Sequence, residues 1–143
     1  MTPFERAVRA EIYSLFAGGT FEVDAAQLAQ SRGWDRHEVQ ESLESLEAQH
    51  TISLVAGMHR VLMAHPFASL DSGYQAHIDT RSWFANCAWD ALAIVALLGN
   101  GNGRATGREL DIDWSIEDGR VSPNGIVHLL VPARQFWDDI GFT

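Results

Sequence analysis

Three amphipathic helical segments, separated by glycine, open the chain and constrain its fold more than any other feature. Within residues 3–16, apolar side chains recur at helical spacing: Phe4, Val8, Ile12, Leu15 and Phe16. Gly18 and Gly19 then stop this helix. Aspartates that can cap a helix begin the next two segments, which span about 24–32 and 35–49 and are separated by Gly33.

A short hairpin is expected after the third helix. Residues 51–55 and 59–63 read as two strands joined by a tight turn that contains Gly57. Three helices followed by a hairpin are typical of a winged-helix domain. Small and turn-forming residues at 68–73 then predict a linker. We therefore expect one lobe over residues 1–67 and a second over residues 74–143.

The second lobe is expected to mix strands with one central helix. Its expected elements are a strand at 74–79, a helix from about Ser82 or Asn86 to Leu98, a flexible loop at 99–103, strands at 109–114 and 126–131, and a short helix at 133–140. The predicted fold class is α+β, with an N-terminal winged-helix-like helical lobe followed by a small α/β lobe with a mainly antiparallel sheet.

The charge of the chain argues against nucleic acid as a partner. The net charge is −9, and the ten basic residues, all arginine, are scattered. Carboxylates recur every third residue along the third helix, at Asp35, Glu38, Glu41, Glu44 and Glu47. Such a helix would be repelled by DNA phosphates, so its acidic side is interpreted as a solvated face of a scaffolding lobe.

The sequence shows neither a secretory signal nor a membrane span. Charged residues interrupt any apolar core within residues 1–16, and the longest apolar run, 91–98, is far short of the ~20 residues that cross a bilayer. A cytoplasmic protein without a membrane partner is therefore expected.

Cys87 is the sole cysteine, which excludes an internal disulfide and a cysteine-rich zinc site. The six histidines lack the spacing of zinc ligands, so no metal cofactor is expected. The glycine-rich segment 99–107 is not a dinucleotide-binding motif, because it follows a helix and lacks the third glycine at the right offset. Cys87 is then either an inert buried thiol or a reactive one.

Asp90 follows Cys87 at a spacing that places both side chains on one helix face, with their Cβ atoms about 5–6 Å apart. A thiolate is a soft nucleophile and a soft-metal ligand, and a carboxylate can accept and return a proton. A helix start near Asn86 would also favour the thiolate through the helix dipole. Alternatively, Cys87 is a small core residue, and Asp90 caps the helix or pairs with Arg81.

Three segments of the chain resemble the alkylmercury (organomercurial) lyases. The most specific is Arg-Ser-Trp-Phe-Ala-Asn-Cys-Ala-Trp-Asp-Ala-Leu at 81–92, continuing to Leu-Leu-Gly at 97–99. The others are His-Pro-Phe at 65–67 and the segment 131–143. The winged-helix-like first lobe is also a feature of that family.

The resemblance implies protonolysis of carbon–mercury bonds in cytosolic detoxification. Cys87 matches the family's first active-site cysteine, the thiolate that binds mercury, and Asp90 matches the aspartate that donates the proton. Both would contact mercury as substrate and product. The implied partners are a small organomercurial and low-molecular-weight thiols, which serve as co-substrate, with no cofactor.

The family also uses a second cysteine, just after the position matched by Thr143. The resemblance therefore implies either a natural chain that continues past Thr143 or a protein that has lost the second thiolate. Two alternatives to a lyase follow. One is a non-catalytic, single-thiol protein that binds an organometal or metal ion. The other is a metal-sensing regulator, which the acidic third helix disfavours.

Overall fold

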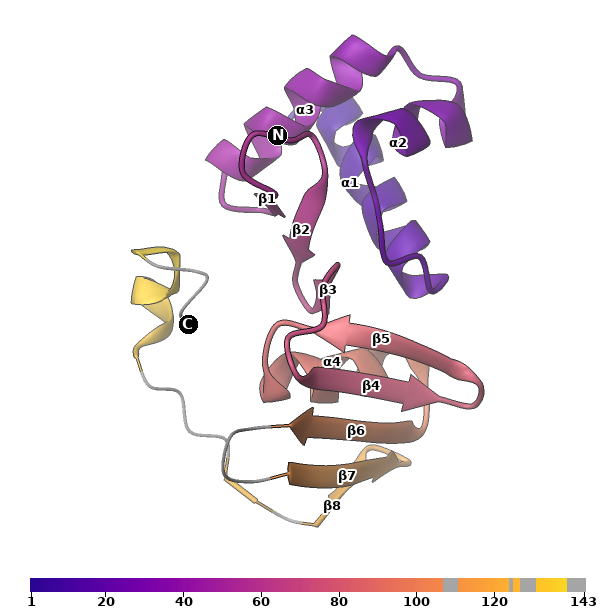
Figure 1. Ribbon diagram of the computed structural model, residues 1–143, viewed down its shortest axis with the longest axis vertical. Coiled ribbons are helices and arrows are strands. Elements are labelled where there is room, and N and C mark those ends of the chain that lie inside the picture. The colour runs from indigo at the N-terminus through magenta and orange to yellow at the C-terminus, as the bar shows by residue number, and fades with distance from the viewer. Residues whose placement is uncertain (107–110, 124, 127–130, 139–143) are drawn as a thin grey trace.

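The structure is a computed structural model that describes residues 1–106, 111–123, 125–126 and 131–138. Within these residues, four α-helices and one eight-stranded antiparallel sheet form an α+β fold (Figure 1). Three helices come first, and the fourth lies among the strands. The predicted fold class is therefore confirmed.

The first three helices begin where the sequence places capping residues. They are α1 (Pro3–Ala17), α2 (Ala25–Arg32) and α3 (Arg36–Ala48). The side chains of Thr2, Asp24 and Asp35 each accept a hydrogen bond from a backbone N–H in the first turn, which stabilises the helix start. Gly33 ends α2 in the left-handed conformation, with φ of 67°, which glycine adopts without strain.

The three helices pack through their apolar stripes and are also joined by two polar contacts. Val8, Ile12, Phe16, Val39, Leu43 and Leu46 are all buried. Arg32 of α2 lies 2.6 Å from Glu11 of α1, and Ser45 of α3 donates to Glu5 of α1 at 2.7 Å. These contacts lower the pKa of both glutamates, so both carboxylates stay charged in the folded protein.

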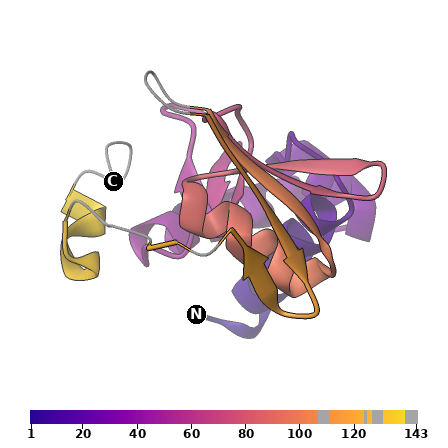
Figure 2. The same ribbon diagram turned by 90° about the horizontal axis from the view of Figure 1, so that it is seen from below.

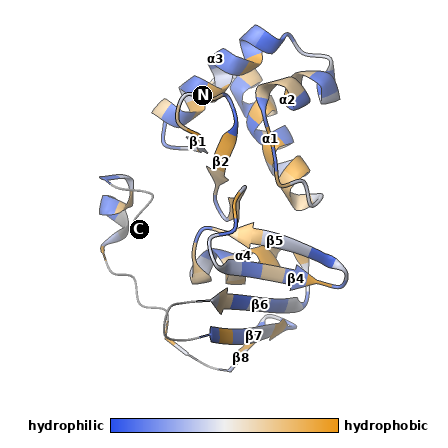
Figure 3. Cartoon of the chain, in the orientation of Figure 1, coloured by the Kyte–Doolittle hydropathy of each residue, from blue (hydrophilic) through white to orange (hydrophobic). Residues whose placement is uncertain are grey.

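The outer side of α3 is strongly hydrophilic, as Figure 3 shows. Asp35, Glu38, Glu41 and Glu44 are exposed along it. We predict that the protein does not bind duplex DNA, because phosphates repel this face. Fluorescence anisotropy with a labelled duplex at low salt, where electrostatic binding is strongest, is the measurement. Submicromolar binding to any duplex would contradict this prediction.

Eight strands form a single sheet in the order β1-β2-β3-β5-β4-β6-β7-β8. They are β1 (Ser53–Leu54), β2 (Val61–Ala64), β3 (Phe67–Ala68), β4 (Tyr74–Ile78), β5 (Arg81–Ala85), β6 (Gly101–Thr106), β7 (Asp111–Glu117) and β8 (Arg120–Ser122). Helix α4 (Ala88–Leu98) connects β5 to β6 and packs across one face of the sheet (Figure 2). This crossover places the start of α4 close to β3, where Asn86, two residues before the helix, donates to the Phe67 carbonyl.

Helix α1 joins the helical lobe to the sheet. The rings of Phe16 and Phe67 stack with centroids 5.7 Å apart, and the indole of Trp83 donates to the Phe16 carbonyl at 2.8 Å. The sheet and the buried core both continue across the junction between residues 67 and 74. The division into lobes at 1–67 and 74–143 stays a prediction.

Strand β5 excludes the earlier of the two expected starts of the central helix, about Ser82, whereas the later one, Asn86, lies two residues before α4 begins at Ala88. Trp83 and Ala85 are buried, whereas Arg81 and Ser82 are exposed, so one side of this strand packs on the core. Asp79 adopts a positive φ of 54° in the turn that pairs β5 with β4. The apolar residues of 81–85 therefore belong to a hairpin, and the helix begins only after Cys87.

Strand β6 corrects the expectation of a flexible loop at 99–103. Gly101 and Gly103 lie within it, between β4 and β7. A Cβ atom at Gly101 would collide with the His77 carbonyl, and one at Gly103 with the indole of Trp114. Glycine is needed here because neighbouring groups pack directly on the backbone. A prediction based only on the flexibility of glycine does not account for this packing.

Replacing Gly103 with alanine should destabilise the protein by about 1–3 kcal/mol, the usual cost of overpacking a core. The added methyl would displace the buried indole of Trp114. Gly125→Ala is the control, because a Cβ there meets no atom of the described residues within 4 Å. Urea unfolding of the three proteins measures the difference. Equal stability of Gly103→Ala and the parent chain would contradict this packing.

Other boundaries differ from the sequence expectation by a few residues. The linker predicted at 68–73 begins within β3, and β8 was not expected. The predicted strand at 109–114 is found as β7, with residues 109–110 outside the described part. Most of the predicted strand 126–131 also lies outside it, as does the end of the predicted helix 133–140, whose described portion is a 3-10 helix, η1 (Ala133–Asp138).

Candidate functional site

Cys87 and Asp90 lie together at the N-terminus of α4. Cys87 is the N-cap, with extended backbone (φ −154°, ψ 178°), and Asp90 is in the first turn. The expectation that both project from helical backbone is therefore corrected for Cys87. Its carbonyl accepts the first hydrogen bond of the helix, from Ala91 at 3.0 Å. The thiol and the carboxylate are consequently held at a rigid helix start.

The thiol of Cys87 is half-buried. Burial raises its pKa above the ordinary value, and the negative charge of Asp90 raises it further. The backbone N–H groups of Asp90 and Trp89 act in the opposite direction but do not prevail. The helix start thus acts on the thiol pKa in the expected direction, through these N–H groups, but burial outweighs it. At neutral pH the thiol keeps its proton until something displaces it.

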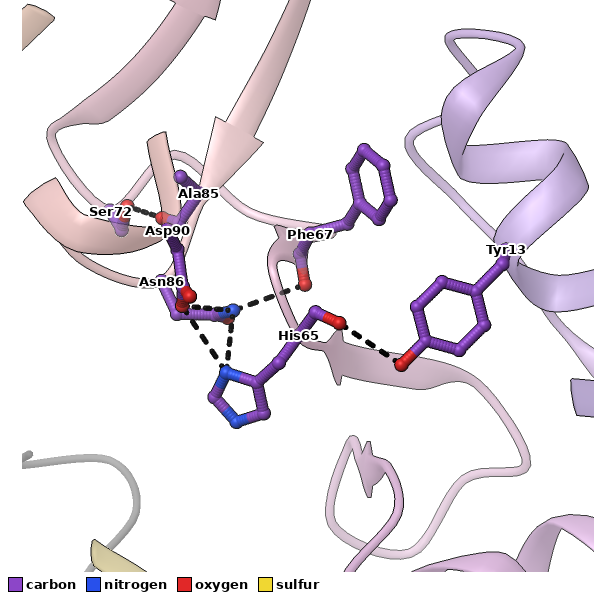
Figure 4. A network of polar contacts seen from close by, with 7 residues as sticks. All are labelled: Tyr13, His65, Phe67, Ser72, Ala85, Asn86 and Asp90. Atoms are coloured by element: carbon purple, nitrogen blue, oxygen red, sulfur yellow. Dashed lines mark hydrogen bonds and ion pairs between the residues drawn. The ribbon is translucent and has the colours of Figure 1, made fainter. Parts of the chain in front are cut away.

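Asp90 lies in a polar cluster with His65 and Asn86 (Figure 4). One carboxylate oxygen of Asp90, Oδ2, lies 3.2 Å from Nδ1 of His65 and accepts a hydrogen bond from Nδ2 of Asn86 at 3.0 Å. The Asp90 side chain is only 13% exposed. A carboxylate so nearly buried needs such partners, because an unpaired buried charge is costly.

Four segments distant in the sequence supply and hold this cluster. His65 lies in the turn between β2 and β3, and its carbonyl accepts a hydrogen bond from the Tyr13 hydroxyl of α1 at 3.0 Å. Asn86 lies between β5 and α4 and donates to the Phe67 carbonyl of β3 at 3.3 Å. Trp137 of η1 packs edge-on against the His65 ring, with centroids 6.2 Å apart.

Sequence reasoning did not assign His65 or Asn86 to the site. His59, another histidine of the β1–β2 region, lies apart from this cluster and pairs with Glu44 of α3 at 2.7 Å. Arg81 does not pair with Asp90 but lies over the Trp83 ring. One sequence signal could have identified His65. The segments 65–67 and 81–92 both resemble the alkylmercury lyases, which is a reason to expect them to lie close together in the fold.

No metal centre of the usual kind occurs in the described part of the chain. There, no three side chains of His, Cys, Asp or Glu come together as metal ligands. The described helices also include none that is long and apolar enough to cross a bilayer.

Comparison with solved structures identifies a similar fold. The mercury-bound form of MerB2 superposes with a TM-score of 0.68 at 18% sequence identity, over 85% of this chain and 60% of that chain. The likeness is one of fold. This chain thus spans about 60% of the MerB2 chain. No protein-family model matches the sequence, and no curated protein matches it in a sequence comparison.

Proposed function

We propose that this protein is an organomercurial lyase, which cleaves a carbon–mercury bond by protonation. One observation carries the proposal. A half-buried thiol and a nearly buried carboxylate meet at the start of α4, in a fold similar to that of mercury-bound MerB2. Sulfur is the ligand type that a soft metal such as mercury prefers. A neighbouring carboxyl group supplies the proton that the departing carbon requires.

Capture of the substrate forms a sulfur–mercury bond at Cys87. The organomercurial R–Hg⁺ arrives bound to a small thiolate, which leaves as the Cys87 sulfur bonds to mercury. The raised thiol pKa means that Cys87 enters this step with its proton. Asp90 lies close enough to take that proton, so its carboxylate becomes a carboxylic acid. Charge and atoms balance, because the proton moves from sulfur to oxygen.

Cleavage returns that proton to carbon. The Asp90 carboxyl group protonates the carbon bonded to mercury, and the electron pair of the carbon–mercury bond forms the new carbon–hydrogen bond. The hydrocarbon R–H leaves, Asp90 is again a carboxylate, and Hg²⁺ stays on the Cys87 sulfur. No oxidant or reductant is consumed, so the proposed reaction needs no resident cofactor.

Removal of Hg²⁺ requires further thiolates. Because Cys87 is the sole cysteine of these 143 residues, a low-molecular-weight thiol is proposed to bind the mercury as the carbon leaves and then to carry it away. The proposed partners are thus an organomercurial and small thiols. A cytoplasmic location, where reduced thiols are abundant, fits this proposal.

The second candidate function is a binder that captures an organomercurial or metal ion without cleaving it. The single thiol favours it, since one sulfur holds the departing Hg²⁺ less firmly than two. Both candidates share Cys87 as the mercury ligand and differ in whether Asp90 delivers a proton to carbon.

Methane release from methylmercury tests the lyase. The protein is incubated with methylmercury and an excess of a small thiol, and headspace methane is measured by gas chromatography. We expect more methane than the thiol alone produces. Stoichiometric uptake of methylmercury without methane would instead establish the binder.

A further inference from the structure

We propose that His65 and Asn86 are positioning residues that together hold one oxygen of Asp90 and leave the other to carry the transferred proton. This inference rests on the proposed lyase function and extends it to two residues that do not touch the mercury themselves. It follows from how the donors and acceptors of the cluster must be assigned (Figure 4).

Only one orientation of the Asn86 amide places its N–H groups on acceptors, and in that orientation its buried Oδ1 has no hydrogen-bond partner among the described residues. Its nitrogen lies 3.0 Å from Oδ2 of Asp90 and 3.3 Å from the carbonyl of Phe67, and both of these atoms are acceptors. Turning the amide over would bring three oxygens together. The two N–H groups of Asn86 are therefore committed, one to Asp90 and one to the backbone of β3.

The ring of His65 must then donate to Asp90. Its Nδ1 lies 3.2 Å from Oδ2 of Asp90 and also 3.2 Å from the nitrogen of Asn86. Because both hydrogens of that nitrogen are already used, Nδ1 is not an acceptor there. It carries a hydrogen and donates it to Asp90, so Oδ2 receives two N–H donors from two different segments.

Both donors are anchored independently of Asp90. The backbone of His65 is fixed by the Tyr13 hydroxyl at 3.0 Å, and Asn86 directly precedes the N-cap of α4. The orientation of the carboxylate is thus set from both the β2–β3 turn and the start of the helix. Fixing a reacting group in this way removes rotational freedom that the transition state would otherwise lose.

The assignment also distinguishes the two oxygens of Asp90. Oδ2 already accepts two N–H groups, and a proton placed there would clash with them. Neither His65 nor Asn86 donates to Oδ1. The proton that Asp90 takes up and returns to carbon therefore resides on Oδ1, the oxygen that these residues leave free.

Separate measurements of capture and release test the positioning role. Capture of phenylmercury is followed by intact mass, and benzene release is followed in a single turnover. We expect His65→Ala and Asn86→Ala to capture phenylmercury as the parent chain does, but to release benzene at least about 10-fold more slowly, since small misplacements of reacting groups cost up to about 100-fold.

Two further variants sharpen this comparison. His65→Asn keeps an N–H donor at the place of Nδ1 and should recover release to within about threefold of the parent rate, because the bond to Oδ2 is restored. His59→Gln is the matched control, since His59 pairs with Glu44 away from the cluster. Equal release by all variants would overturn the proposal. Parallel loss of capture and release would also overturn it, by showing a merely structural role.

The side-chain amide of Asn86 gives a readout that does not depend on catalysis. Its ¹H–¹⁵N signals, assigned by their disappearance in Asn86→Ala, should be protected from exchange in the parent chain and lose that protection in Asp90→Ala. If the parent chain releases no benzene, the lyase proposal fails, yet this measurement still decides whether the amide holds Asp90. Unchanged Asn86 signals in Asp90→Ala would overturn the positioning inference.

Discussion

Replacing Cys87 with serine is expected to abolish capture of phenylmercury. A serine hydroxyl is a hard ligand that stays protonated at neutral pH, whereas mercury requires a soft sulfur. Affinity should fall by more than about 100-fold, since losing even an outer-shell partner of a metal ligand costs 10–100-fold. Intact mass spectrometry after incubation with one equivalent of phenylmercury measures the bound fraction directly.

The same thiol should react in the folded protein and show a dependence on pH. Cys87 is half-buried and its pKa is raised, so alkylation by iodoacetamide should accelerate as pH rises, with a midpoint above that of a free cysteine. Cys87→Ser is the control, because the 143 residues contain no other thiol. Alkylation that occurs only after unfolding would show that Cys87 is an inert core residue.

Replacing Asp90 with asparagine is expected to separate capture from cleavage. Asparagine retains the size of aspartate and can still contact the cluster, so the thiol stays in place and binds phenylmercury, with its proton passing to the small thiolate that leaves mercury. It has no acidic proton to deliver, and general acid catalysis contributes about 10²–10⁴-fold. Benzene release in a single turnover should therefore fall by about that factor, as measured by gas chromatography.

Asp90→Asn also has a consequence for the free thiol. Removing the neighbouring negative charge removes one of the causes that raise the pKa of Cys87, so alkylation should shift toward lower pH. Loss of phenylmercury binding in Asp90→Asn would instead make Asp90 a contact of mercury or a structural residue. Unchanged benzene release would remove it from the mechanism.

Local signals in the sequence were sufficient for the helical lobe. The caps at Asp24 and Asp35 and the stop at Gly33 act within one turn of helix, so they can be read directly from the sequence. The expectation of a flexible loop at 99–103 was wrong because the effect of the glycines in β6 is not local. Gly103 is needed where Trp114, on a different strand, packs over the backbone.

The candidate site likewise combines residues that the sequence indicates locally with residues that only the fold brings together. Cys87 and Asp90 are close in sequence, and their chemistry could be inferred from their residue types and spacing. His65 and Asn86 reach Asp90 only because β3 pairs with β5, which brings the β2–β3 turn to the start of α4. That pairing skips β4, and nothing in the local pattern of residues 65–86 specifies it.

The proposed lyase function depends most directly on whether the phenyl group leaves the protein-bound adduct while mercury stays on Cys87. The adduct of the parent chain with phenylmercury is separated from excess reagent, a small thiol is added, and the mass of the protein is followed together with the benzene formed. The mechanism predicts loss of the phenyl group from the protein-bound adduct with an equal yield of benzene, and the same conversion about 10²–10⁴-fold more slowly in Asp90→Asn. An adduct that keeps its phenyl group, or gives it up equally fast in both proteins, would contradict the assignment of Cys87 and Asp90 as the cleaving pair.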